Sequence, residues 1–292
     1  MLYRMTTFCC LALLIGCTSS TTEPTAKSSP PASVSNKTPA SPSTTSQTPS
    51  PSVEPGGWGN LKGRFVYEGD VPKTIKLTPT KDQAVCGKHE LFNESLVVNP
   101  ENKGIQNVVI CLYTKKGDSP PIHDSYQSTA GDQVTLDNEF CRFNNHITVL
   151  RTSQKLLIRN LDAVGHNTKI DTLSNTPVNP ILAANSDLEQ LFPKAERNPV
   201  QVSCSIHPWM IGYLLVKDHP YFAVTDENGD FEIKNLPTGE WTFSVWQEKS
   251  KAIQEVVVDG AKANWKRGRF EQVIPEGDTD LGEIFVSAAQ FE

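Results

Sequence analysis

The chain has 292 residues, a formal net charge of −6 and seven cysteines. The negative charge argues against a nucleic-acid-binding protein, because such proteins usually carry a basic surface. No segment is apolar over the roughly 20 positions that a membrane-spanning helix requires. The composition therefore predicts a protein whose bulk is water-soluble and whose partners are not nucleic acids.

The N-terminus has the features of an export signal. Arg4 supplies a positive charge, and residues 5–14 form an apolar core that is too short to cross a bilayer. The core ends in "LIGC", which resembles the lipobox of bacterial lipoproteins. The resemblance implies that residues 1–16 are a signal peptide and that Cys17 becomes the lipid-bearing N-terminus. The alternative is an ordinary signal peptide with a chance cysteine.

Residues 17–55 differ from the rest of the chain in composition. They are rich in Ser, Thr and Pro and contain no aromatic residue. Such a segment cannot bury enough apolar surface to offset its ordering entropy, so we expect it to be disordered. Its expected role is that of a tether between the membrane and the folded part.

From Gly56 onward the pattern is that of an all-β protein. Short apolar runs alternate with Gly, Pro, Asn and Asp, and no helical period is sustained. Strands at this spacing imply Greek-key β-sandwiches, and about 235 residues suit two sandwiches better than one. Strands are expected at 61–67, 108–113, 147–151, 155–160, 200–204 and 212–216, with a short helix near 186–191.

The C-terminal part, residues 219–292, has a signature of its own. Its stretch "TDENGDFEIKNLPTGEWTFSVW" resembles the carboxypeptidase-regulatory-like (transthyretin-like) β-sandwich. That family begins with two further strands, which "LKGRFVYEGDVP" and "GIQNVVICLYT" in residues 57–127 could supply. The resemblance implies a split outer sandwich, with residues 128–218 inserted into it. Two tandem sandwiches are the simpler alternative.

The strongest chemical signal is the segment "CSIHPWM", which places Cys204, His207 and Met210 in one loop after an expected strand. A further histidine, His166 in "GHN", follows another expected strand upstream. One thiolate, two imidazoles and a weak thioether are the ligand set of a type 1 copper site. A structural zinc site would need more Cys or His, and a c-type haem needs C-x-x-C-H.

This order of strand, His-Asn loop, strand and Cys-His-Met loop resembles the cupredoxins, with a short ligand loop similar to that of amicyanin. The resemblance covers residues 130–217 and implies a cupredoxin domain over residues 128–218 that binds one mononuclear copper ion. The implied copper ligands are His166, Cys204, His207 and Met210.

The same resemblance assigns roles to the neighbours of these ligands. Asn167 would tie the two ligand loops together through the backbone and side chain of Ser205. Pro208, Trp209 and Ile211 would form an apolar collar around His207, where electrons enter.

The redox environment of an exported protein bears on the remaining cysteines. Disulfides are permitted in an exported protein, although a domain of this size does not require them. We expect a disulfide between Cys86 and Cys141 and a buried thiol at Cys111, but the sequence leaves other pairings open.

Together these features predict an envelope-anchored type 1 copper protein that transfers single electrons. A coordinatively closed copper has no open position for a substrate, so we do not expect an enzyme. The expected partners are a redox protein, such as a cytochrome or a membrane oxidoreductase, and the membrane through the lipid, on its periplasmic or outer surface. Two alternatives stay open: copper sequestration or delivery, and a structural or carbohydrate-binding surface lipoprotein.

Overall fold

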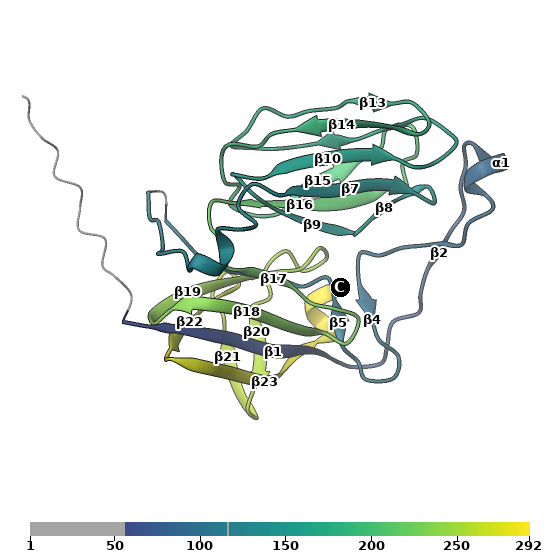
Figure 1. The fold of residues 1–292 in the computed structure, drawn as a ribbon. Coiled ribbons are helices and arrows are strands. Elements are labelled where there is room, and N and C mark those ends of the chain that lie inside the picture. Colours follow the sequence, from purple (N-terminus) through teal and green to yellow (C-terminus); the bar gives the residue numbers. More distant parts are fainter. Residues whose placement is uncertain (1–55, 116) are drawn as a thin grey trace, which may run out of the picture. The chain divides into compact units, whose positions relative to one another are not determined.

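A computed structural model of the chain describes residues 56–115 and 117–292. The expected signal peptide, Cys17 and the tether lie outside these residues. Regular structure in the described part is almost entirely β, as the sequence predicts (Figure 1). No helix in this part is long and apolar enough to cross a membrane.

One β-sandwich, which we call the outer sandwich, takes its strands from both ends of the described chain. Its two sheets have the strand orders β18-β1-β23-β20-β21 and β17-β6-β19-β22. The bounds are β1 (Trp58–Glu68), β6 (Val109–Leu112), β17 (Phe222–Val224), β18 (Asp230–Pro237), β19 (Gly239–Trp246), β20 (Glu255–Val258), β21 (Ala261–Asn264), β22 (Arg269–Ile274) and β23 (Gly277–Ser287).

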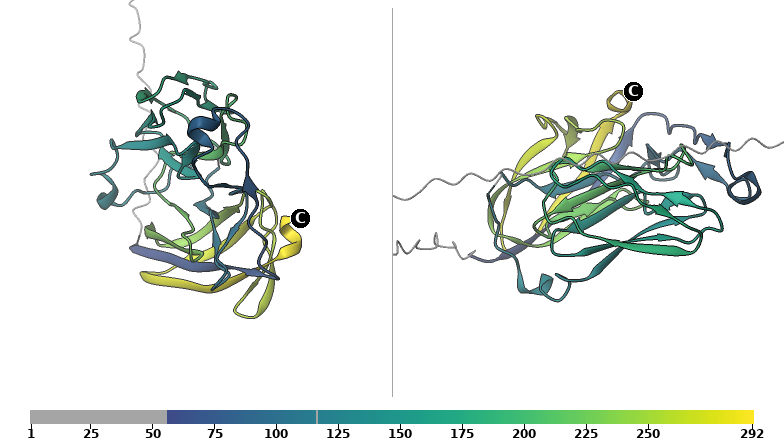
Figure 2. Two further views of the ribbon diagram at one scale, coloured as in Figure 1. Left: turned by 90° about the vertical axis from the view of Figure 1, so that its right-hand side faces the viewer. Right: turned by 90° about the horizontal axis from the view of Figure 1, so that it is seen from above.

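Strands far apart in the sequence pair within these sheets. β1 pairs antiparallel with β18 and parallel with β23, so the purple and yellow strands lie side by side (Figures 1 and 2). β6 pairs antiparallel with both β17 and β19. The strands of residues 58–112 and those of residues 222–287 therefore share the same two sheets.

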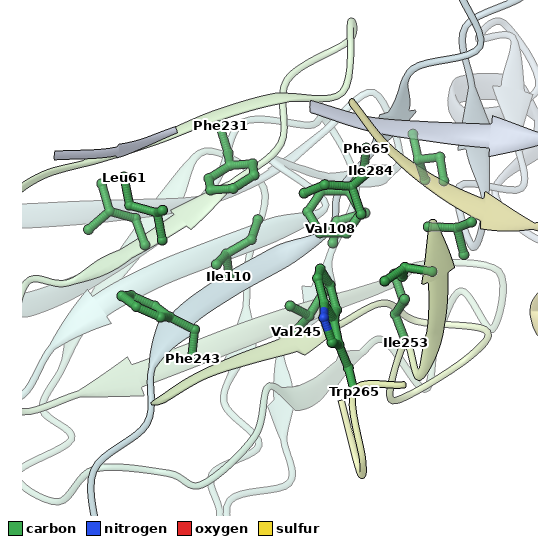
Figure 3. Close-up of a cluster of buried hydrophobic side chains, with 14 of the residues drawn as sticks. Leu61, Phe65, Val108, Ile110, Phe231, Phe243, Val245, Ile253, Trp265 and Ile284 are labelled. Carbon is green, nitrogen blue, oxygen red and sulfur yellow. The ribbon is translucent and has the colours of Figure 1, made fainter. Parts of the chain in front are cut away.

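The core of the outer sandwich follows from alternation along its strands. In β18, Phe231 and Ile233 are buried while the residues between them face solvent. In β19, Phe243 and Val245 are buried and Ser244 between them is half-buried. These side chains meet Trp265 and others in one apolar cluster (Figure 3). Burial of this apolar surface, at roughly 25 cal/mol per Å², is the main term that holds the two sheets together.

The turn between β17 and β18, which belong to different sheets, depends on Gly229. Its φ is +81°, and a Cβ atom there would lie 2.3 Å from the carbonyl oxygen of Phe65. Only glycine fits both the left-handed backbone and this close approach. The turn therefore lies where the sequence "ENG" indicates a tight turn.

A second β-sandwich, which we call the inner sandwich, lies between β6 and β17 in the sequence. Its sheets have the strand orders β14-β10-β7-β8 and β12-β15-β16-β9, and β11 pairs with β13. The bounds are β7 (Gln133–Glu139), β8 (Arg142–Asn144), β9 (Ile147–Arg151), β10 (Lys155–Asn160), β11 (His166–Asn167), β12 (Lys169–Ile170), β13 (Ile181–Leu182), β14 (Ser186–Gln190), β15 (Val200–Ser203) and β16 (Ile211–Lys217).

The prediction of a short helix near residues 186–191 was wrong. Residues Ser186–Gln190 form β14, which pairs antiparallel with the whole of Leu156–Asn160 in β10. The segment has residues that suit a helix, but the neighbouring strand offers its backbone a full ladder of hydrogen bonds. Tertiary pairing outweighs a local preference of a few tenths of a kcal/mol per residue.

The chain between β1 and β6 has little regular structure and runs out to α1 (Figure 1). A disulfide joins Cys86, at the end of α1, to Cys141 in the turn between β7 and β8, with a Cα–Cα distance of 5.4 Å. Cys111 is a buried free thiol. The elements of this segment are β2 (Lys76–Leu77), α1 (Gln83–Cys86), β3 (Leu91–Phe92), β4 (Val97–Val98) and β5 (Ile105–Gln106); two 3-10 turns, η1 (Asp124–Tyr126) and η2 (Ala288–Phe291), occur elsewhere.

We predict that Phe243→Ala lowers the free energy of unfolding by about 3–5 kcal/mol, because Phe243 is fully buried in the outer core. Val273→Ala is the matched control on the paired strand β22, where the Val273 side chain is exposed. Its expected effect is within about 0.5 kcal/mol. Urea unfolding measures both, and equal losses for the two variants would contradict this description of the core.

Candidate metal centre

The loop between β15 and β16 holds three of the expected ligands. Cys204 directly follows β15, and Met210 directly precedes β16. The Met210 amide donates to the carbonyl oxygen of His207 at 2.9 Å, and the Cys204 amide donates to the carbonyl oxygen of Met210 at 3.2 Å. These bonds fold the segment into a tight turn, so residues three positions apart lie at one place.

Three of the four expected ligands bring their donor atoms together. The Cys204 sulfur and one ring nitrogen each of His166 and His207 lie within 4.8 Å of one another. The Nδ1 atoms of the two histidines are 2.9 Å apart, and the sulfur is 3.8 Å from the His207 Nδ1. The fourth expected ligand, Met210, is 1% exposed and lies in the same apolar cluster as Cys204.

Asn167 joins the two ligand loops. Its Oδ1 accepts hydrogen bonds from the amides of Ser205 at 2.8 Å and Ile206 at 3.2 Å. The Cys204 sulfur lies 3.4 Å from the same oxygen. The link was expected through the backbone and side chain of Ser205, and in the structure it is made by the backbone amides of Ser205 and Ile206. The bond holds the Cys204 loop beside His166.

Two carboxylates bind the far side of the imidazoles. The Nε2 atom of His166 is 2.8 Å from an oxygen of Asp162, and the Nε2 atom of His207 is 2.8 Å from an oxygen of Asp82. Each pairing fixes the ring so that its Nδ1 atom faces the cluster. A second ring nitrogen bound to a carboxylate is the usual support of a metal-ligating histidine, and it makes the ligand more basic.

Sequence reasoning missed both carboxylates. Asp162 lies four residues before His166 in the same loop, so proximity to the ligand could have indicated it. Asp82 lies 125 residues from His207 and carries no local signal. Only the folded chain brings it to the site.

The surroundings of His207 differ from the expected collar. His207 is 0% exposed, because the Asp82 carboxylate covers its outer edge. The Trp209 ring is 5.0 Å from the His207 ring, and its Nε1 donates to the carbonyl oxygen of Cys141. The indole therefore packs beside the ligand, as the sequence indicates, but the imidazole edge does not face solvent.

The protonation states follow from these contacts. Burial by itself lowers the pKa of His166, but the hydrogen bonds and charges of Asp162 and Cys204 raise it to about 9. Burial raises the pKa of the Cys204 thiol, and hydrogen bonds from His166 and the backbone lower it more, so the net shift is downward. The pKa of His207 is lowered, mainly by burial. His166 is therefore the more basic of the two imidazoles, and its Nδ1 atom lies 2.9 Å from that of His207.

The donor set fits copper. A thiolate and two imidazole nitrogens converge in a buried, apolar surrounding, and a thioether is packed in the same cluster. Soft sulfur ligands suit Cu(I), and imidazoles suit both oxidation states. A second group of close donor atoms, Cys141, Asp162 and His166, offers no thiolate because Cys141 is in the disulfide.

Comparisons with known proteins give partial structural similarities. No protein-family model matches the sequence, and no curated protein matches it. A copper-containing nitrite reductase from Thermus scotoductus SA-01 is 21% identical with a TM-score of 0.27, covering 29% of this chain and 22% of that chain. A purple cupredoxin from Nitrosopumilus maritimus is 20% identical with a TM-score of 0.25, covering 30% of this chain and 99% of that one.

A Cu(I) form of an amicyanin variant is 16% identical with a TM-score of 0.27, covering 38% of this chain and 99% of that chain. This chain thus spans less than a quarter of the nitrite reductase that it matches. The case for copper depends on the geometry of the ligands.

We predict that metal binding at neutral pH releases about one proton, because a cation replaces the proton held at His166. Below a pKa of about 9, His166 is protonated, so the apparent copper affinity rises with pH and levels off above that value. Competition titration against a chelator over this range measures the slope. In Asp162→Asn the levelling should move to lower pH, because the carboxylate that raises the pKa is gone. An affinity independent of pH below that value would contradict the assignment.

Proposed function

We propose that this chain is a type 1 copper protein that transfers single electrons at the bacterial cell envelope. The observation that carries the proposal is the convergence of the Cys204 sulfur with the Nδ1 atoms of His166 and His207. Copper bound there would supply a one-electron couple. Met210 is the proposed weak axial ligand, the type of group that tunes the potential of such sites.

The residues around the ligands support electron transfer. Asp162 accepts hydrogen bonds from the backbone amides of Phe140 and Cys141 at 2.8 Å, so it is held in place when it binds His166. Asn167 holds the Cys204 loop in the same way. A ligand set that cannot move needs little rearrangement between Cu(I) and Cu(II), and a small rearrangement favours fast electron transfer.

Burial of the donors argues against a role as an enzyme. His166 and His207 are 0% exposed, and Cys204 is 2% exposed. A substrate would need an open coordination position next to a pocket. The same burial disfavours copper delivery, which needs an accessible metal that exchanges readily.

The carbohydrate-binding alternative has less support. Exposed aromatic side chains on the outer sandwich would favour it. However, Trp246 is 8% exposed, and Trp241 is partly buried against the outer core and donates to the carbonyl oxygen of Pro237. The outer sandwich, with its transthyretin-like signature, is proposed to be a structural support.

The proposed location and partners follow from the sequence. The "LIGC" segment and the tether support a lipid anchor at Cys17 on the periplasmic or outer surface of a membrane. An anchored copper domain would exchange electrons with a redox protein, such as a cytochrome or a membrane oxidoreductase. The net charge of −6 does not favour nucleic acid.

We predict that the copper-loaded protein has an intense visible thiolate-to-copper band that is absent from Cys204→Ser, because the thiolate supplies the electron density for the transition. Cys111→Ser is the matched control, since Cys111 is also a buried free thiol but lies in the outer sandwich. Absorption spectra of the three proteins test this. A colourless protein that binds copper, or a band that survives in Cys204→Ser, would exclude the type 1 site.

A further inference from the structure

We propose that residues 78–90, which we call the covering loop, close the metal centre. In this proposal Asp82 is a positioning residue for His207, and the Cys86–Cys141 disulfide links the loop to the inner sandwich. The inference rests on the proposed copper site and extends it to a segment outside the inner sandwich. The covering loop connects β2 to β3 and contains α1 (Figure 1).

Asp82 lies over the outer edge of the His207 ring. Its carboxylate lies 2.8 Å from the His207 Nε2, and its own side chain is 43% exposed. The carboxylate is therefore the group between the ligand and solvent. While it stays there, His207 is 0% exposed, and neither a partner protein nor a small molecule can reach the imidazole edge.

Asp82 is attached to the disulfide through the short helix α1. Asp82 has left-handed backbone angles, φ 46° and ψ 41°, and its carbonyl oxygen accepts from the amides of Val85 and Cys86. One turn of helix thus connects the Asp82 carboxylate to the disulfide-bonded Cys86. A helix of four residues does not persist by itself in water. The disulfide supplies the constraint that keeps Asp82 over the ligand.

The disulfide is also connected to the other histidine ligand, His166. The Cys141 amide donates to the same Asp162 oxygen that binds His166. Phe140 and Cys141 have φ values of 56° and 55°, an uncommon conformation for residues other than glycine in a two-residue turn. Asp162 holds both of their amides. The disulfide is therefore part of one network of hydrogen bonds that reaches the imidazoles of both His166 and His207.

Reduction of the disulfide would remove the covalent link between the covering loop and the inner sandwich. A dithiol reductant of the thiol–disulfide oxidoreductase class would supply two electrons and two protons, cleaving the S–S bond to two thiols while it becomes a disulfide itself. The contacts left between the loop and the inner sandwich would be a small apolar cluster, the packing of His89 on Phe140 and the Asp82 contact. The pairing of β2 with β3 and the exposed Lys76–Glu90 ion pair join only the two ends of the loop to each other. An exposed ion pair contributes little. The redox state of the disulfide would thus set access to the ligands.

The test of the cover uses the metal-free full chain and iodoacetamide. Cys204 is 2% exposed, so its alkylation reports opening of the loop. We expect alkylation at least about 10-fold faster in Asp82→Ala and in the double variant Cys86→Ser with Cys141→Ser, because each removes a restraint on local opening. Glu90→Gln is the matched control, since it removes a carboxylate of the same loop that points to Lys76. Peptide mapping separates Cys204 from Cys111.

The test of positioning uses copper. In Asp82→Asn we expect an affinity lower by about 10- to 100-fold and a shifted thiolate-to-copper band, as for other losses of a ligand's hydrogen-bond partner. Asp82→Glu should restore part of both, and Glu90→Gln should change neither.

Unchanged alkylation in Asp82→Ala and the double variant would overturn the cover. An unchanged affinity and spectrum in Asp82→Asn would overturn the positioning role. If the unmodified chain bound no copper, the proposed function would fail, while the alkylation rates would still decide whether the loop covers Cys204.

Discussion

The side-chain oxygen of Asn167 holds together two loops that approach the site from different parts of the inner sandwich. It accepts from the amides of Ser205 and Ile206, and through them it sets the position of Cys204 beside His166. Asn167 is 3% exposed, so its side-chain oxygen is buried and these two amides satisfy it. The close approach of the Cys204 sulfur to the two ring nitrogens depends on these hydrogen bonds to Asn167.

Once Asn167 has set the positions of the two loops, two carboxylates determine which ring nitrogens of the histidines face inward. Asp162 and Asp82 each bind an Nε2 atom, so both Nδ1 atoms point into the cluster. The same negative charges lie near the place where a cation would bind. They would favour the more highly charged oxidation state of a metal bound there, and would therefore lower its reduction potential relative to a site without them.

The two carboxylates reach the site by different routes. Asp162 belongs to the loop after β10, and it is fixed by the turn between β7 and β8. Asp82 belongs to the long connection between two strands of the outer sandwich, β1 and β6. Since the outer strands come from both sides of the inner sandwich in the sequence, a segment of that connection can lie against a ligand loop and be fastened there by the disulfide.

The sequence by itself determined the features that depend on local pattern. Alternating apolar residues predicted β9 and β10 to the residue and most of β1, β6, β15 and β16. The spacing of Cys204, His207 and Met210 indicated a metal loop, because ligands three residues apart in a tight turn share one face. The upstream pair His166-Asn167 indicated the second ligand loop, because it also follows a predicted strand.

Only the tertiary structure decided the features that depend on distant pairing. Residues 186–190 became a strand because β10 lies beside them, although their local preference allows a helix. Asp82 reached His207 across 125 residues, and no short-range pattern records such a contact. The covered imidazole edge has the same cause: a loop sequence specifies which ligands it carries, whereas what lies over those ligands is set by segments that fold back from elsewhere in the chain.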